Sequence, residues 1–224
     1  MEKIVSKDGI VGSPTQILLA CGAVAGPLYI TVGVIQMLIR PGYNPTRHDL
    51  SLMSNGELGW IQIANFVMTG LLVIVGAFGM RQILRGSRAG MWGPLLTGIY
   101  GLGLIGAGIF VADPSLGFPP GTPTDAHTIS GHGLMHFVAG GVGFLALILA
   151  CFVFARWFRA LQQRGWAVYT TLTGILFFAA FFGIATGAQL GGSVLVLVTL
   201  AFTAAVVNTW VWLSAMFLRL LTVP

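Results

Sequence analysis

Long uncharged stretches constrain the fold of this chain more than any other feature of its sequence. Most of the chain falls into uncharged runs at 9–39, 58–80, 89–112, 126–155 and 165–218. A helix that crosses a bilayer needs about 20 apolar residues, so the first four runs can hold one span each and the last can hold two. The sequence therefore predicts an all-α membrane protein with six transmembrane helices.

The composition supports this fold class and excludes others. Only 8% of the residues are charged and 56% are hydrophobic, with a mean hydropathy of +0.89. Such a chain is too apolar for an ordinary soluble domain, a nucleic-acid-binding domain or a disordered protein. We expect the tryptophans mostly at the membrane interfaces. We also expect a single domain over 1–224, with spans near 15–39, 60–84, 91–112, 130–155, 166–187 and 193–218.

The basic residues, which give the chain a net charge of +5, predict its orientation. If both termini are cytoplasmic, only Arg40 and Arg47 lie outside. The inner side then holds Lys3, Lys7, Arg81, Arg85, Arg88, Arg156, Arg159, Arg164 and Arg219. Because cytoplasmic loops carry an excess of Lys and Arg, we expect a multi-pass plasma-membrane protein with both termini inside. The longer polar segments 40–59 and 113–129 are then on the outer face.

The histidines all fall in these outer segments or at the outer end of the fourth span. His132 and His136 are four residues apart, so they share one helix face and can reach one metal ion. A zinc site with an open position needs a third protein ligand, for which His48 and Asp113 are candidates. Hydrogen bonding of the histidines across helices is the alternative. Zinc is the metal that this pattern favours, and haem is the alternative cofactor.

The first outer segment adds further polar candidates. His48 and Ser51 are three residues apart, so a short helix there would place a base beside a hydroxyl group. Arg47 and Arg40 are candidates for holding a lipid phosphate. Pairing of either arginine with Asp49 is the structural alternative.

Two candidates lie at or within the spans. Asp113 ends the third span, where its carboxylate can orient an imidazole or hold a metal-bound water, or simply face solvent. Asn65 and His136 each precede the letters Phe-Val-x-x-Gly. If this similarity reflects a duplication of the first two spans, the two residues occupy matching positions that face a shared centre. Chance similarity and interhelical hydrogen bonding of Asn65 are the alternatives.

Several segments resemble the bacterial membrane-protein family known as domain of unknown function 998. The segments are Arg47-His48-x-x-Ser51, Trp60-Ile61-Gln62-x-x-Asn65-Phe66, Gly108-Ile109-Phe110-x-x-Asp113-Pro114, Gly117-Phe118-Pro119-Pro120-Gly121 and His132-x-x-x-His136. The resemblance covers about residues 17–218. It implies a six-helix bundle and brings no established activity.

The polar residues are also similar in kind to the site of the transmembrane hydrolases that include alkaline ceramidases and adiponectin receptors. That site holds zinc through histidines and activates a water for amide hydrolysis in lipids, although those proteins have seven spans. The likeness implies a metal-dependent hydrolase acting on a lipid or lipid-linked substrate. A non-enzymatic membrane subunit or small-molecule-binding protein is the alternative. The expected roles are metal ligation by His48, His132 and His136, catalysis by Ser51 and Asp113, and substrate binding by Arg40, Arg47 and Asn65.

Overall fold

Six long helices form most of the computed structural model, which describes residues 14–125 and 129–222. The long helices are α1 (Pro14–Ile39), α2 (Gly59–Ile83), α3 (Arg88–Ile109), α4 (Gly131–Ala160), α5 (Arg164–Gly187) and α6 (Gly192–Leu221). Two short 3-10 helices are η2 (Leu50–Ser54) and η3 (Ala188–Leu190). Each long helix has the length and apolar character needed to cross a membrane. The predicted all-α, six-span architecture is confirmed.

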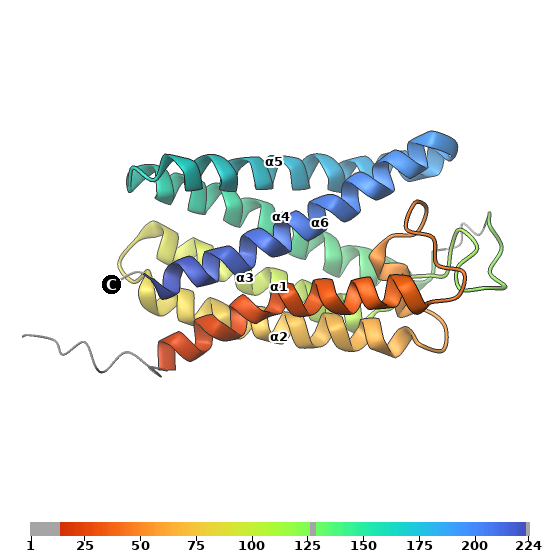
Figure 1. The fold of residues 1–224 in the computed structure, drawn as a ribbon, viewed down its shortest axis with the longest axis horizontal. Coiled ribbons are helices and arrows are strands. Elements are labelled where there is room, and N and C mark those ends of the chain that lie inside the picture. Colours follow the sequence, from red (N-terminus) through yellow and green to blue (C-terminus); the bar gives the residue numbers. More distant parts are fainter. Residues whose placement is uncertain (1–13, 126–128, 223–224) are drawn as a thin grey trace, which may run out of the picture.

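The contacts between the six helices close into a ring. Each helix packs against its neighbours in sequence, and α6 returns to pack against α1. We call one end of the bundle the loop end, because it carries the long loop 40–58, the segment 110–125 that follows α3, and the α5–α6 turn (Figure 1). The opposite end, the terminal end, carries the start of α1, the end of α6 and the short α2–α3 and α4–α5 connections.

Glycine allows the close approach of α3 and α4. A Cβ atom placed on Gly103 would lie 2.7 Å from the Cα of Gly143, well inside van der Waals contact. A larger residue at Gly103 would therefore push the two helices apart. In lipid, packing drives helix association more than hydrophobicity does, which accounts for the many small residues in these spans.

The two long loops at the loop end pack on each other around Phe118. This ring is fully buried, and its centroid lies 5.6 Å from that of Tyr43 and 5.4 Å from that of His48. The Tyr43 hydroxyl donates a hydrogen bond of 2.8 Å to the carbonyl oxygen of His48. Burial raises the pKa of Tyr43 above its ordinary value, so the phenol stays protonated and keeps this bond. These contacts pack the two loops together over one end of the bundle.

Candidate functional site

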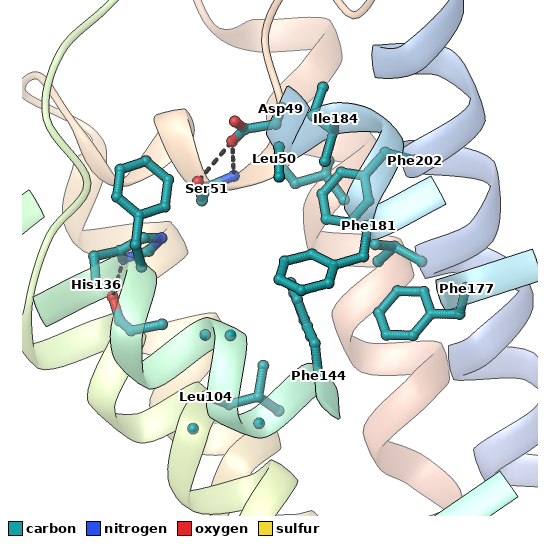
Figure 2. A pocket seen from close by; sticks show the side chains of 18 of the residues that line it. Asp49, Leu50, Ser51, Leu104, His136, Phe144, Phe177, Phe181, Ile184 and Phe202 are labelled. Carbon is teal, nitrogen blue, oxygen red and sulfur yellow. Dashed lines mark hydrogen bonds between the residues drawn. The ribbon is translucent and has the colours of Figure 1, made fainter. Parts of the chain in front are cut away.

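A cavity of about 320 Å³ extends from the middle of the bundle toward the loop end (Figure 2). Its lining includes η2 and residues 115–116, together with the adjoining ends of α5 and α6. Every long helix contributes an aromatic side chain to its lining: Tyr29, Phe66, Tyr100, Phe144, Phe177 and Trp210. The centre of the ring of helices is therefore a largely aromatic chamber.

Ring contacts join these aromatic side chains into a continuous layer. Tyr29 stacks on Trp210 with centroids 4.7 Å apart, and Trp210 lies 5.6 Å from Tyr100. Tyr100 is 6.5 Å from Phe144, which meets Phe177 edge-on at 5.1 Å. Such aromatic pairs contribute stabilisation in addition to that from the apolar area they bury, which holds the layer in place. The layer offers an apolar surface to whatever enters the cavity.

The cavity also has polar side chains. Figure 2 shows Ser51 and His136 on one side and Phe144, Phe177 and Phe181 on the other. The polar or charged lining residues are Arg47, Asp49, Ser51, Ser115, His136 and Gln189, besides Tyr29, Tyr100, Thr209 and Trp210. Most of the first set come from the loops and turn of the loop end, so the cavity changes from aromatic to polar in that direction.

His136 is held in one tautomer by the backbone of α3. Its Nδ1 lies 2.8 Å from the carbonyl oxygen of Phe110 and 3.1 Å from that of Ala107. Carbonyl oxygens only accept hydrogen bonds, so Nδ1 carries the proton of the neutral ring and Nε2 carries the lone pair. The side chain is only 6% exposed. Its Nε2 has no hydrogen-bond partner within residues 14–125 and 129–222.

Asp49 organises η2 on the same side of the cavity. Its Oδ1 accepts hydrogen bonds from the backbone N–H of Ser51 at 2.9 Å and of Leu52 at 3.2 Å, which caps the short helix. It also accepts a hydrogen bond of 2.6 Å from the Ser51 hydroxyl group. The Ser51 proton is therefore committed to Asp49, and the oxygen keeps only its lone pairs for other partners.

Three of the predicted site residues meet at this cavity: Arg47, Ser51 and His136. Arg47 is exposed, and its guanidinium makes no hydrogen bond or ion pair with any other residue that the structure describes. The expected pairing of Arg47 with Asp49 is therefore not formed. The guanidinium is free to meet a ligand or solvent.

His48 has a different environment from His136, although both are predicted metal ligands. The His48 ring is 3% exposed and both of its nitrogens are occupied. Nδ1 accepts the backbone N–H of Asn44 at 3.0 Å, so Nε2 carries the proton and donates to the carbonyl oxygen of Leu116 at 3.0 Å. His48 thus ties the two long loops together, and neither nitrogen is available to a metal.

The predicted metal centre is not assembled in this structure. His132 lies in the first turn of α4, where it is exposed and meets the ring of Phe110 edge-on at 5.8 Å. His127 lies outside the described residues. The described part of the chain contains no group of three His, Cys, Asp or Glu side chains that could hold a metal ion. In this structure His48, His132 and His136 therefore each have contacts of their own.

Asp113 holds Ser130, the N-cap residue of α4, and does not line the cavity. Its two carboxylate oxygens accept the backbone N–H of Ser130 at 2.7 Å and the Ser130 hydroxyl at 2.6 Å. The Ser130 oxygen in turn accepts the N–H of Gly133 at 3.0 Å, which is the N-cap bond of the helix. The contacts of Asp113 therefore support a structural role, in which it holds the N-cap residue of α4 in place.

Two predicted substrate-binding residues also have structural environments. Arg40 is buried and donates to the carbonyl oxygen of Met53 at 3.1 Å and to that of Asn55. Burial lowers the pKa of its guanidinium from the ordinary value. Asn65 is buried between α1 and α2 and donates to the carbonyl oxygen of Tyr29 at 3.3 Å. Neither residue lines the cavity.

Comparison with known protein families supports the resemblance seen in the sequence. The chain matches the family described as "Protein of unknown function (DUF998)" over residues 23–219. The chain belongs to this family. No curated protein and no solved structure gave a match. Because the family description carries no activity, the function of this member has to be argued from its cavity.

The sequence did not reveal several residues that shape the cavity of this family member. Trp210 is 1% exposed and Trp212 is fully buried, although tryptophans were expected mostly at the interfaces. The aromatic residues of the layer come from six separate spans, so no local spacing connects them. Gln189 belongs to a turn of small and polar residues that has no pattern of its own. The available signal was an aromatic residue inside every predicted span.

Proposed function

We propose that the protein binds an amphipathic, lipid-like small molecule in this cavity. The apolar part of the ligand would lie on the aromatic layer, and its polar headgroup would lie toward the loop end. The observation that carries the proposal is the lining itself, in which aromatic side chains from all six helices meet a set of polar groups. Pockets for small molecules typically combine a mostly apolar wall with a few placed polar groups and have volumes of about 300–1,000 Å³.

The positive-inside distribution of basic residues supports an orientation for this binding site. We place both termini in the cytoplasm and the loop end on the outer face of the plasma membrane. Arg40 and Arg47 are the two basic residues on the loop-end side. In this orientation the polar part of the cavity is level with the outer headgroups, and membrane lipids are the nearest source of a ligand.

Metal-dependent hydrolysis of a lipid has less support than binding. Within the described residues no three potential ligands come together, and Asp113 is occupied by the cap of α4. The Ser51 hydroxyl makes no hydrogen bond to a histidine among the described residues. It donates to the Asp49 oxygen that also accepts the two backbone N–H groups at the start of η2, which fits a capping role for this pair. The non-enzymatic alternative, a membrane protein that binds a small molecule, therefore accounts better for these contacts.

A pair of glycine substitutions tests the proposal. A Cβ atom on Gly140 or on Gly98 would meet no other atom within 4 Å, so a side chain can start at both positions without a clash at its first carbon. Gly140 lines the cavity, whereas Gly98 lines a groove between α2 and α3 nearer the terminal end. Gly140→Leu should fill the cavity, and Gly98→Leu is the matched control.

Binding can be followed by fluorescence quenching in phosphatidylcholine nanodiscs, with a long-chain alcohol brominated at its methyl end. Bromine quenches tryptophan at close range, and Trp210 lies in the aromatic layer. We expect saturable quenching that is reduced in Trp210→Phe, because the reporter is lost. Gly140→Leu should abolish the saturable part while Gly98→Leu retains it. Equal quenching in both leucine variants would contradict binding in this cavity.

A further inference from the structure

His136 presents an unpaired hydrogen-bond acceptor to the cavity. The α3 carbonyl groups of Ala107 and Phe110 hold the ring by Nδ1, which leaves the Nε2 lone pair without a partner among the described residues. The ring centroids of Phe66 and Phe137 lie 6.3 Å and 6.1 Å away, so its near neighbours are apolar. The side chain is only 6% exposed, so bulk water has little access to it, and its free nitrogen gains a hydrogen bond from any donor that a ligand or a water brings.

Ser51 adds a second acceptor on the same side of the cavity (Figure 2). Its hydroxyl proton is donated to Asp49 at 2.6 Å, so its oxygen can only accept from a ligand. Asp49 also lines the cavity and carries a negative charge. This side therefore suits a headgroup that donates hydrogen bonds. A carboxylate or phosphate, which can only accept, would meet two acceptors and a like charge.

We infer that the ligand has a neutral, hydroxyl-bearing headgroup whose O–H donates a hydrogen bond to Nε2 of His136. This inference rests on the proposed function, because it names the chemistry of the ligand in the same cavity. Long-chain alcohols, sterols and acylglycerols all carry such a group on an apolar body. The exposed guanidinium of Arg47, which also lines the cavity, makes an anionic headgroup the competing possibility that the experiment has to separate.

Three probes with the same brominated alkyl chain separate these possibilities: the alcohol, its methyl ether and the corresponding carboxylate. The ether keeps the oxygen but carries a methyl group in place of the hydroxyl hydrogen, so it cannot donate a hydrogen bond to His136. We expect the alcohol to bind the wild-type protein about tenfold more tightly than the ether, the size of one lost buried hydrogen bond. The carboxylate should bind no better than the ether.

Variants assign this preference to His136. In His136→Phe the alcohol and the ether should bind with equal affinity, close to that of the ether in the wild type, since phenylalanine keeps the volume and removes the acceptor. Ser51→Ala should reduce the preference for the alcohol less than His136→Phe does. Because the comparison of alcohol with ether is made first in the wild-type protein, it does not depend on how well either variant folds.

The outcomes distinguish this inference from the proposed function. Equal binding of alcohol and ether to the wild type, with both lost in Gly140→Leu, would overturn the hydroxyl-headed ligand and leave cavity binding intact. Tightest binding by the carboxylate, lost in Arg47→Gln, would also overturn the inference in favour of an anionic ligand. Absence of saturable binding by all three probes would overturn both proposals.

Discussion

Tyr29 and Trp210 stack with their ring centroids 4.7 Å apart and their planes 24° from parallel, at the place where α1 meets α6. These are the first and last helices of the bundle, so this contact helps to close the ring that the other helices build in sequence order. Both rings also line the cavity. The closure of the fold and the shape of the candidate binding site therefore depend on the same pair of side chains.

Removal of the Trp210 side chain should destabilise the bundle. We expect Trp210→Ala to lower the free energy of unfolding in detergent by about 3 kcal/mol, the cost typical of a large aromatic residue lost from a packed core. Trp60, which is 64% exposed, provides the control. Trp60→Ala should change the free energy by less than about 0.5 kcal/mol. Similar losses in the two variants would contradict a structural role for the stacked pair.

His48 and His132 should differ in their effects on stability. His48→Ala removes both hydrogen bonds that link Asn44 and Leu116 through the ring, so we expect a loss of about 1–3 kcal/mol in unfolding free energy. His132→Ala removes an exposed ring and should be nearly neutral. Protease sensitivity of the two long loops gives an independent measurement, and it should increase only in the His48 variant. The reverse order of effects would refute the assignment of His48 as a loop clamp.

Zinc provides a separate test of the histidines. Because His48, His132 and His136 have separate partners, we expect added zinc to leave the thermal midpoint of the metal-stripped protein unchanged. The same result should hold in His132→Ala and His136→Ala. A zinc-dependent rise in the midpoint that disappears in His136→Ala would show that a metal site forms, and it would return hydrolysis to consideration.

Cysteine labelling tests the proposed orientation. In a background without Cys21 and Cys151, a cysteine that replaces Thr122 at the loop end should react with a membrane-impermeant thiol reagent in intact cells. A cysteine that replaces Ser87, in the α2–α3 connection, should react only after the cells are opened. The opposite pattern of labelling would place the polar part of the cavity in the cytoplasm.

The sequence predicted the transmembrane helices well because the length of each uncharged run indicates whether it can span the bilayer. A run without charges either is or is not long enough to span the hydrocarbon, and the runs at 9–39 and 58–80, for example, became α1 and α2. The length of these runs does not indicate which helices pack against each other. The stacking of Tyr29 on Trp210 joins the first span to the last, and no local pattern in the sequence specifies that contact.

The site was predicted only in part, for a physical reason that His132 and His136 illustrate. Their spacing correctly places them on one face of α4, yet a helix face does not say what lies opposite each turn. His136 faces the end of α3, whose carbonyl groups hold it, whereas His132 lies one turn nearer the start of α4 and is exposed. The partner of His136 is the backbone carbonyl group of Phe110. Every residue has such a group, so the sequence does not indicate which one binds the histidine.

The most direct test of the account is to locate the ligand in the cavity. The protein crystallised in lipid with the brominated long-chain alcohol should give an anomalous bromine peak beside the aromatic layer, near Trp210 and Phe144, with the hydroxyl group at Nε2 of His136. The peak should be lost in Gly140→Leu and kept in Gly98→Leu. A bromine peak only in the groove between α2 and α3, or a cavity peak that persists in Gly140→Leu, would contradict the proposed binding site.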